Sequence, residues 1–415
     1  MIIKRLIATL LLSLLWGGFL SAQQSLNVCQ DCPLKTLSEG IAAAHRFDTI
    51  YLQKGVYYEN NVTISKPLVI IGVGFPVIDG REKGEILEIM ADSVLLTGVE
   101  VRNVGTSYIH DQAGIYLKEV KDVRVVGNRL INTFFGIYLE HSQQVQVSGN
   151  YIKGQAKDEL SSANAIHLWK CHKIHISDNF VTGHRDGIYM EFVDSSLVEN
   201  NESTGNLRYG LHFMFSNDDR YFNNRFIENG VGVAVMYSDR IEMTENKFTH
   251  NWSPVSYGLL LKEIRYSKIW HNKFLKNTTA IYMENTIESD VYENDFISNG
   301  WGVKIMGNCE EVVFHSNNFM GNSFDVSTNT QHNYNKFNNN YWSAYTGYDL
   351  DHDGTGDVPF RPVKLFGYLV EQVPISIILL RSPFMELLNH AENVIPVITP
   401  ETLKDESPKM KPIKW

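Results

Sequence analysis

The chain has 415 residues, of which 43% are hydrophobic and 12% aromatic, and this composition is that of a folded globular protein. Its formal net charge is −10, and no cluster of lysine and arginine interrupts the acidic balance. A dedicated nucleic-acid-binding protein is therefore excluded, because such proteins carry a basic patch or stripe.

The first 22 residues predict a secretory signal peptide. Two basic residues, Lys4 and Arg5, precede the apolar stretch 6–20, and small residues follow at 21–22. An uncleaved anchor at the same place is the alternative. No later segment reaches the ~18 consecutive apolar residues that a membrane span needs. We expect the mature chain to act outside the cytoplasm.

Residues 23–48 form an N-terminal segment and cap. Cys29 and Cys32 lie in the stretch "CQDC". In an oxidising compartment they predict a short disulfide, and a thiol pair for soft-metal or exchange chemistry is the alternative. The following stretch, "KTLSEGIAAAHRF", predicts a short amphipathic helix that covers the open end of a stack of strands.

A phrase of about 22 residues recurs through the middle of the chain, as in "GIYLKEVKDVRVVGNRL" and "GIYLEHSQQVQVSGNYI". A small residue opens each unit, at Gly114, Gly136, Ala165, Gly187, Gly210, Gly232, Gly258, Ala280 and Gly302. Fourteen residues after each of the first eight stands an asparagine, at Asn128, Asn150, Asn179, Asn201, Asn224, Asn246, Asn272 and Asn294. The ninth, Asn317, comes one residue late. Self-similarity at a fixed period indicates a repeat architecture.

Within each unit the side chains alternate between apolar and polar with a period of two, as they do in strands. Apolar residues stand one, three and eleven positions after the opening residue, as Ile115, Leu117 and Val125 do. Each unit is too short for a strand, a helix and their turns. We therefore predict an all-β, right-handed parallel β-helix over residues 49–340, with coils about 4.8 Å apart. The asparagine column predicts turns with left-handed backbone and hydrogen bonds along the stack.

Two longer steps between units mark insertions, near "GQAKDELSSANA" and "THNWSPVSYG". Insertions in a solenoid project on one face and are often functional. We expect both loops to stand out from the rod.

The stretch "HLWKCHKIHI" brings His167, Cys171 and His172 close together in sequence. Together with Cys29 and Cys32 they are secondary metal candidates, because imidazoles and thiolates bind soft and borderline metals. Strand alternation and the turn after the strand argue against one closed site that uses all of them.

A sugar-cleaving β-helix would need two carboxylates at a set separation. Asp218 and Asp219 are adjacent, and Asp186 lies beside His184 and Arg185. Adjacent residues of an extended strand point to opposite faces, and turn roles suffice for this pair. We therefore favour a non-catalytic protein, and a polysaccharide lyase, hydrolase or epimerase is the alternative hypothesis.

Outward side chains two and four positions after each opening residue suggest a copper site. Adjacent coils make Met214 and Met236 neighbours, with His212 two residues along the strand. Two thioethers and an imidazole form a soft ligand set that favours Cu(I) over hard cations. The alternative is an apolar outer patch for a protein partner.

Residues 341–362 break the repeat with the stretch "DLDHDGTGD". Asp349, Asp351, Asp353 and Asp357 match positions 1, 3, 5 and 9 of a looped Ca²⁺ site, with glycine at position 6. The bidentate glutamate expected at position 12 is missing. We predict a structural calcium site, and a plain Asp/Gly turn is the alternative.

Residues 363–415 form an apolar, partly helical tail that Pro374, Arg381 and Pro383 interrupt. Such a segment is too broken to span a bilayer and too apolar to be a free tail. We predict that it docks on a partner, one that can itself be embedded in a membrane, and packing on the chain's own rod is the alternative. The docking candidates are Leu379, Leu380, Phe384, Leu387 and Leu388.

The signal peptide, the "GIYL…GN" coils, the block "NNNYWSAYTGYDLDHDGTGDVPFRPV" and the tail around "ILLRSPFMELL" together resemble the NosD family. These are periplasmic maturation factors of nitrous-oxide reductase, with a β-helix of the CASH type shared by sugar-binding and sugar-hydrolysing proteins. Many pectin-lyase-like proteins share the coil repeat, whereas the Asp-rich block and the tail are more specific.

The resemblance implies a non-catalytic periplasmic assembly factor that works with an ABC transporter made of a membrane subunit and a cytoplasmic ATPase. It also implies a part in assembling the copper–sulfur centre of nitrous-oxide reductase, with a separate copper-delivering lipoprotein as donor. The tail would dock on the membrane subunit, so that membrane contact is indirect. The family motif does not assign His212, Met214 and Met236, which remain candidates from their spacing.

Overall fold

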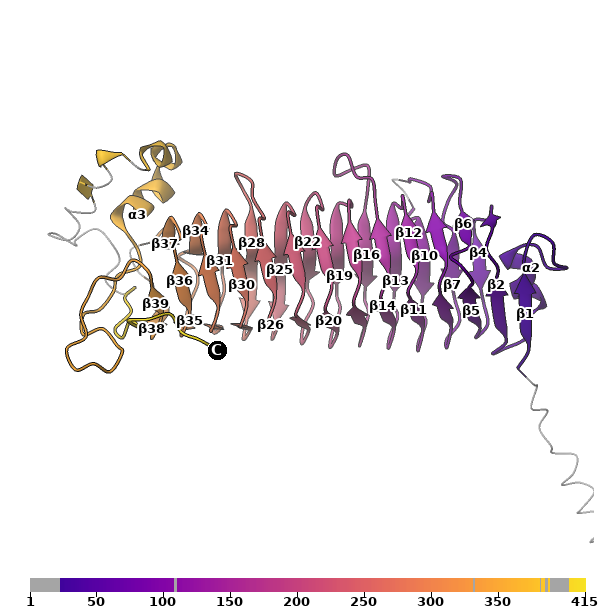
Figure 1. The fold of residues 1–415 in the computed structure, drawn as a ribbon, viewed down its shortest axis with the longest axis horizontal. Helices are drawn as coiled ribbons and strands as arrows, with labels where there is room; N and C mark the ends of the chain where they lie inside the picture. The colour runs from indigo at the N-terminus through magenta and orange to yellow at the C-terminus, as the bar shows by residue number, and fades with distance from the viewer. Residues whose placement is uncertain (1–22, 108–109, 331–332, 381, 385–386, 389–402) are drawn as a thin grey trace, which may run out of the picture.

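The computed structural model describes residues 23–107, 110–330, 333–380, 382–384, 387–388 and 403–415, and the predicted signal peptide lies outside them. Three parallel sheets run side by side along one rod, which is a right-handed β-helix of about 14 turns (Figure 1). The predicted fold class is confirmed. Among the described helices, none is long and apolar enough to cross a membrane.

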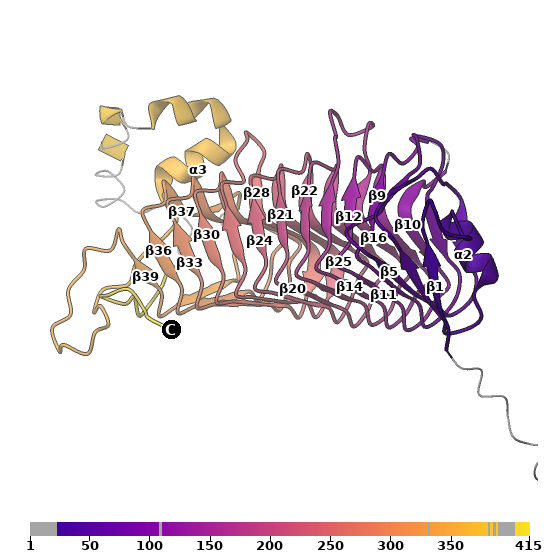
Figure 2. The same ribbon diagram turned by 45° about the vertical axis from the view of Figure 1, so that its right-hand side comes forward.

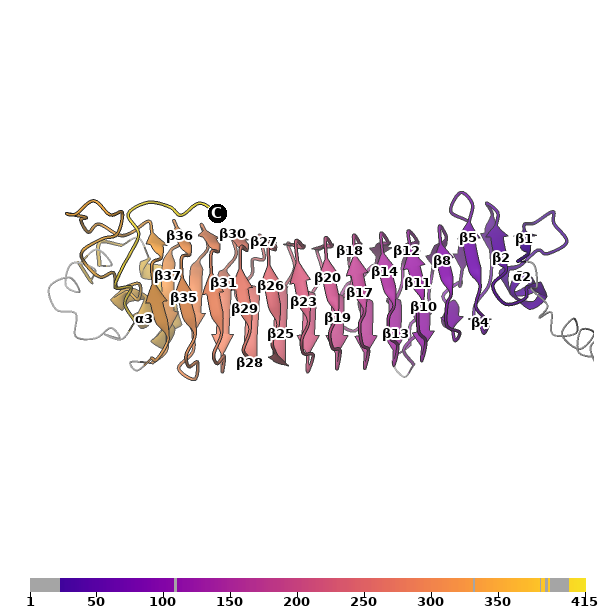
Figure 3. The same ribbon diagram turned by 90° about the horizontal axis from the view of Figure 1, so that it is seen from below.

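Each coil adds one strand to each sheet, in the order sheet 1, sheet 2, sheet 3 along the repeated phrase. Sheet 1 has the strands β4 (Val62–Ile64), β7 (Leu87–Ile89), β10 (Ala113–Lys118), β13 (Phe135–Glu140), β16 (Asn164–Trp169), β19 (Asp186–Glu191), β22 (Tyr209–Met214), β25 (Val231–Asp239), β28 (Tyr257–Arg265), β31 (Thr279–Glu284), β34 (Trp301–Ile305) and β37 (Phe324–Thr328). Sheet 2 has β1 (Ser25–Val28), β2 (Thr49–Leu52), β5 (Val69–Gly72), β8 (Leu95–Thr97), β11 (Arg124–Val126), β14 (Gln146–Ser148), β17 (His175–Ser177), β20 (Leu197–Glu199), β23 (Arg220–Phe222), β26 (Glu242–Thr244), β29 (Lys268–Trp270), β32 (Asp290–Tyr292), β35 (Val313–His315) and β38 (Lys336–Asn338). Sheet 3 has β3 (Val56–Tyr57), β6 (Val77–Asp79), β9 (Glu100–Arg102), β12 (Arg129–Ile131), β15 (Tyr151–Lys153), β18 (Phe180–Thr182), β21 (Glu202–Thr204), β24 (Arg225–Ile227), β27 (Lys247–Thr249), β30 (Lys273–Leu275), β33 (Asp295–Ile297), β36 (Asn318–Met320) and β39 (Tyr341–Trp342). Figure 3 shows successive strands of sheet 2 side by side along the rod.

The interior of the rod is filled by columns of like side chains from successive coils. One such column stacks five phenylalanines and a tryptophan, with neighbouring ring centroids 4.2–5.4 Å apart. Its members are Phe226, Phe248, Phe274, Phe296, Phe319 and Trp342. Since each ring buries its faces against the rings above and below, the same residue type is favoured at the same place in every coil.

The predicted asparagine column is a continuous hydrogen-bonded ladder from Asn128 to Asn340. The backbone N–H and the side-chain amide of each asparagine donate to Oδ1 of the asparagine one coil further on, at 2.9–3.2 Å. The expectation of left-handed backbone at these asparagines is wrong. Positive φ belongs to the residue before each of them, such as Gly127 at 64° and Glu245 at 58°. The ladder asparagines themselves do not have positive φ, and their side-chain amides point along the stack.

The N-terminal end of the rod is covered by α2 (Leu37–Ala43), as the sequence predicts. A capping box closes the start of this helix, because Thr36 Oγ1 accepts from the Glu39 N–H and the Glu39 carboxylate accepts from the Thr36 N–H. The predicted boundary at residue 49 is wrong, since β1 already pairs in parallel with β2 and is the first strand of sheet 2.

The C-terminal end of the chain also differs from the prediction. Helix α3 (Leu365–Gln372) and the 3₁₀ helix η1 (Pro374–Leu379) lie beside the last strands of sheet 1 (Figures 1 and 2). Residues 403–415, however, return to the rod instead of belonging to a tail. Asn318 exchanges two hydrogen bonds of 2.9 Å with the Ile413 backbone, and Leu403 is fully buried.

Asp405 in this returning segment ends the asparagine ladder. Its Oδ2 accepts from the Asn340 N–H at 2.9 Å, from the Asn340 amide at 3.0 Å and from Trp342 Nε1 at 3.0 Å. An acceptor-only carboxylate suits this place, because the ladder arrives with two donors and no further coil follows. A residue 65 positions away in sequence therefore completes the last coil.

Another carboxyl group, that of Asp219, is buried in the wall of the rod. Its Oδ1 accepts from the Ser196 N–H at 2.7 Å, whereas Oδ2 has no hydrogen-bond partner among the described residues. Burial raises the pKa of this carboxyl well above its ordinary value. The folded protein therefore keeps a proton that the unfolded chain releases above pH ~4.

We predict that the free energy of unfolding decreases as the pH rises from 4 to 8, in part because Asp219 loses its proton. In the Asp219→Asn variant this decrease should be smaller by about 1–3 kcal/mol. The measurement is urea unfolding of both proteins across that range. Asp218→Asn is the matched control, because the exposed Asp218 pairs with Arg240 and its pKa is lowered. Parallel pH profiles of wild type and Asp219→Asn would contradict the prediction.

Candidate functional site on the outer face of sheet 1

The outer face of sheet 1 carries a column of tyrosine and histidine rings. The members are Tyr116, Tyr138, His167, Tyr189 and His212, and each is in register with the next. Neighbouring ring centroids lie 4.4–5.1 Å apart. The coil register predicted from the repeat is therefore correct for this face, and it holds the candidate site residues in defined columns.

His212 ends this ring column and is the most unusual residue of the face. It is only 5% exposed, although it lies on the outside of the strand, because Tyr189 and Tyr209 pack against its ring at centroid distances of 5.0 and 4.5 Å. Neither ring nitrogen has a hydrogen-bond partner among the described residues. Burial lowers the pKa of His212 to about 4, so the imidazole is neutral at physiological pH with a lone pair free for a ligand.

The two methionines of the copper hypothesis are neighbours in adjacent coils, as the spacing predicts. Met214 of β22 is paired in register with Met236 of β25, and both side chains are partly exposed. The Tyr189 hydroxyl lies 3.6 Å from Met214 Sδ and 3.2 Å from the carboxylate of Glu191, which is in register with Met214. His212 lies two residues before Met214 on the same face of the strand. An imidazole and two thioethers on the same face of adjacent strands are donors of the type that suits a soft monovalent metal.

The secondary metal candidates do not form one site. Cys171 faces the interior, where its thiol donates to the Leu139 and Trp169 carbonyls and burial raises its pKa to about 11. His167 is half-buried on the outer face, and its Nδ1 accepts from the Asn164 amide at 2.8 Å. His172 is exposed beyond the turn.

The remaining pair of candidates, Cys29 and Cys32, is joined by a disulfide with a Cα–Cα distance of 5.0 Å. Of the two alternatives for "CQDC", the structure has the disulfide, and no thiolate stands at either position to bind a metal. The two free cysteines of the described chain are Cys171 and Cys309, and both are buried.

The carboxylates considered for sugar cleavage do not form a catalytic pair. Asp186 is fully buried and held by Arg208 through two hydrogen bonds of 2.9 and 2.6 Å. Asp218 is exposed and Asp219 is buried, so the two point to opposite sides of the wall as expected. The Asp186–Arg208 pair escaped the sequence reasoning, although a spacing of one coil could have suggested it.

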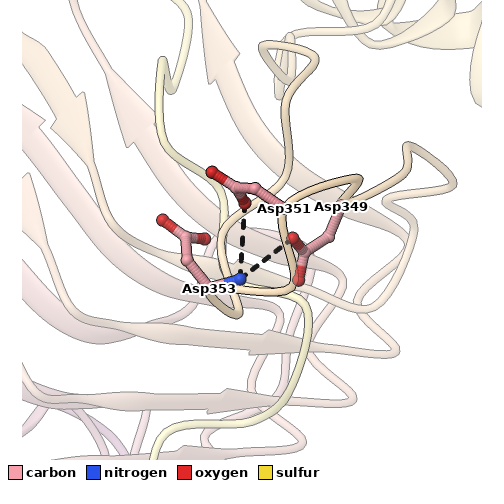
Figure 4. Close-up of side chains that lie close together, drawn as sticks. All are labelled: Asp349, Asp351 and Asp353. Carbon is pink, nitrogen blue, oxygen red and sulfur yellow. Dashed lines mark hydrogen bonds between the residues drawn. The ribbon is translucent and has the colours of Figure 1, made fainter.

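The Asp-rich loop brings three of its four candidate residues together (Figure 4). Carboxylate oxygens of Asp349, Asp351 and Asp353 all lie within 4.8 Å of one another. The loop is closed by N–H groups, since the Gly354 N–H donates to Asp349 at 2.9 Å. Asp357 does not join the cluster, because its carboxylate accepts from the Leu350 N–H at 2.7 Å.

The tail and the second insertion enclose a groove at the C-terminal end of sheet 1. Its volume is about 560 Å³, and its walls are the loop around Trp252 and Val255 on one side and α3 with η1 on the other. Helix α3 is anchored by an ion pair of 2.7 Å between Lys304 and Glu371 and by a buried cluster of Phe324, Phe366 and Val370. The insertion predicted from the longer step therefore does project on this face.

The five docking candidates of the tail divide into two groups. Leu379, Phe384 and Leu387 are exposed. Leu380 and Leu388 instead pack against the cluster that anchors α3. Three more exposed apolar side chains lie on η1, those of Ile375, Ile377 and Ile378, which are 72%, 39% and 77% exposed.

Comparisons with known proteins identify similar sequences and similar folds. A family model described as "Periplasmic copper-binding protein (NosD)" matches residues 202–347. A model described as "Right handed beta helix region" matches residues 78–185 and 113–262.

Two curated relatives are each named "Probable ABC transporter binding protein NosD". The one from Stutzerimonas stutzeri is 28% identical over 197 residues, which cover 43% of this chain and 44% of the relative. The one from Pseudomonas aeruginosa is 28% identical over 173 residues, which cover 38% and 40%. The chain thus matches less than half the length of these relatives.

Among solved structures, the family 28 exopolygalacturonase of Yersinia enterocolitica superimposes with a TM-score of 0.58 and 11% identity, covering 76% of this chain and 78% of the enzyme. At this identity the likeness shows the shared β-helix fold alone.

For the Asp-rich loop we predict that Ca²⁺ raises the Tm of the protein, with a Kd of about 10⁻⁴–10⁻³ M because the three carboxylates are exposed or half-exposed. Asp353→Asn should abolish the shift, whereas Asp31→Asn, at another exposed position, should keep it. The measurement is thermal unfolding in increasing Ca²⁺, with Mg²⁺ as the comparison ion. Equal shifts in all three proteins would show that the loop is a plain turn.

Proposed function

We propose that this chain, a pectin-lyase-like β-helix protein of the NosD type, is a periplasmic accessory protein that holds copper transiently during maturation of nitrous-oxide reductase. The copper-binding description of the matching family supports this proposal, as does the printed name of both relatives. The observation that carries it is the buried ring of His212, which has no hydrogen-bond partner among the described residues and lies on the same strand face as Met214 and Met236.

The donor set supports copper in its reduced form as the proposed metal. A buried imidazole without a hydrogen bond costs free energy, and that cost is offset when a metal takes the lone pair. Thioethers bind Cu(I) well and hard cations poorly. Because the three donors are neutral and the methionines partly exposed, they suit a metal that is passed on rather than kept.

The tail and the names of the relatives support an ABC transporter as a partner. The exposed apolar residues of η1 and of the segment after it form the surface proposed to dock on the membrane subunit of an ABC transporter. Contact with the membrane is then indirect, through that subunit. Nitrous-oxide reductase and a copper-donor lipoprotein are the proposed acceptor and donor, and nucleic acid has no part in this function.

The proposed role is non-catalytic. Asp186 is neutralised by Arg208, and Asp218 by Arg240, so neither carboxylate is placed as a free acid or base. The rival reading, a carbohydrate-active β-helix enzyme, therefore rests on the shared fold, and the same fold serves many functions.

We predict that the purified protein binds one Cu(I) with micromolar or tighter affinity, and that His212→Ala, Met214→Ala or Met236→Ala each weakens binding at least about tenfold through loss of a soft donor. The measurement is competition with a Cu(I) chelator under anaerobic conditions. Met306→Ala is the matched control, since Met306 is a partly exposed methionine four coils further along the rod. Unchanged Cu(I) affinity in all three variants would rule out the proposed copper site.

The pH dependence of this binding distinguishes His212 from an ordinary histidine. Protonation competes with the metal only below the pKa, and the pKa of His212 is about 4. We therefore expect a constant Cu(I) affinity from pH 8 down to about pH 5 and a loss below about pH 4. A loss that begins near pH 6.5 would assign the metal to an exposed histidine instead.

For the tail we predict that Ile378→Ser combined with Leu387→Ser lowers affinity for the transporter's membrane subunit at least about tenfold, because an interface of exposed apolar anchors is lost. Both side chains are exposed, so the Tm should not change. Binding is measured with the detergent-solubilised transporter. Leu350→Ser, on the Asp-rich loop, is the control and should bind as the wild type does.

A further inference from the structure

Three aromatic rings form a stacked column on the corner between sheets 1 and 2. Phe192, Phe215 and Tyr237, called here the corner ladder, are exposed by 44%, 38% and 41%. Their ring centroids lie 5.3 and 5.0 Å apart, with the planes within 18° of parallel. Large apolar rings in successive coils thus stand on the surface, where burial does not account for them.

The backbone of the corner ladder is left-handed. Phe192, Phe215 and Tyr237 have φ of 52°, 51° and 52°, a conformation that bulky side chains rarely adopt. The corner itself does not need aromatic residues, because other coils have Lys170, Glu263 or Asn285 at the equivalent place with φ of 51°, 54° and 50°. Rings have therefore been placed at a strained position that polar residues fill elsewhere, which points to a use on the surface.

A groove of about 610 Å³ runs beside the corner ladder. Its second wall is the column two residues further along each coil, which includes Asn217, Asp239 and Arg265. Phe215 covers one face of Tyr237, so the other face is turned toward the next coil, where Glu263 replaces a ring. None of the cation–π contacts between described residues involves Tyr237.

The rim of this groove is acidic. The surface carboxylates of the corner from the first ladder coil onward are Asp194, Asp218, Asp239, Glu263, Glu288, Glu310 and Glu311. The corner holds two arginines in the same coils, and both are already paired, Arg240 with Asp218 and Arg265 with Asp239. The surface therefore attracts cations, and it joins an aromatic face with carboxylates.

We propose that the corner ladder and its acidic rim are a docking surface for a protein partner whose own face is rich in arginine and apolar side chains. One guanidinium of the partner lies between the open face of Tyr237 and the Glu263 carboxylate. Arginine is favoured over lysine because its planar group stacks on a ring while it donates to a carboxylate.

A saccharide fits this surface less well. Sugars stack on the faces of aromatic rings, whereas the inner faces of the corner ladder are covered by one another and only ring edges line most of the groove. The proposed docking surface rests on these observations and does not depend on copper binding. Because Met214 precedes Phe215 and Met236 precedes Tyr237, a partner bound here also lies beside both thioethers.

The first arm of the test separates binding from folding. Phe215→Asn and Tyr237→Asn delete the rings but keep a residue that tolerates left-handed backbone. We expect the Tm of each variant to equal or exceed that of the parent. A lower Tm in both variants, together with unchanged binding in the second arm, would make the corner ladder a structural zipper and overturn the proposal.

The second arm measures binding of a defined probe, a fluorescein-labelled hexapeptide of alternating arginine and leucine, by fluorescence anisotropy. We expect Tyr237→Asn and Glu263→Gln each to weaken binding about fivefold, and added salt to weaken it further. Tyr266→Asn is the matched control, since Tyr266 is 50% exposed with φ of 55° on the same corner but outside the corner ladder. The Met214→Ala variant should bind the peptide normally, which keeps this test distinct from that of the copper site.

Three further results would also overturn the proposal. One is equal binding of a peptide in which glutamate replaces arginine. Another is an equal loss of affinity in Tyr266→Asn, which would mean that no particular place on the corner is used. The third is binding of cellotetraose that depends on Tyr237 while the arginine peptide does not bind, which would make the groove a saccharide site.

Discussion

The hydrogen-bonded asparagine ladder is the constraint on which the rest of the structure depends. A coil that turns a corner inside a wall of strands leaves backbone groups without ladder partners, and buried groups of this kind must be satisfied. Between Asn128 and Asn340 the asparagine amides do this, bridging each coil to the next and also donating to strand carbonyl groups of the preceding coil, as Asn224 does to Val198 O of β20. One coil must therefore lie on the next in fixed register. The columns on the outer faces, the ring column and the methionine pair among them, inherit that register.

This constraint explains which features the sequence predicts. The asparagine spacing fixes the coil, so the pairing of Met214 with Met236 and the outward position of His212 follow from counting. The exposure of His212 does not follow, because it depends on how Tyr189 and Tyr209 fold over the ring. Residue identity locates a side chain in its column, but packing between columns decides its burial and its pKa.

Features outside the repeat were less accessible. The strand β1 lies 24 residues before its partner in β2 and does not carry the repeated phrase, so the sequence pattern predicts no strand there. The return of residues 403–415 is a contact between segments far apart in sequence, and a single buried aspartate at its centre has no local pattern. The corner ladder is not predictable from the sequence for a different reason. An aromatic residue at the end of a strand is common in sequences, and the positive φ that makes this one unusual is visible only in the structure.

The attachment of the chain beyond the last coil has a mechanical consequence. The segment from α3 to residue 388 is held to the rod by the Lys304–Glu371 ion pair on α3 itself, and residues 403–415 return to the rod after it. A body bound to that segment is thus fixed to the end of a stiff bar at two points. The candidate copper site lies four coils away, about 19 Å at the spacing of strands. Tilting the bar by about 15°, as subunits rotate in allosteric proteins, displaces the site by about 5 Å. In such a tilt the rod would act as a lever, and its length in coils would set the displacement.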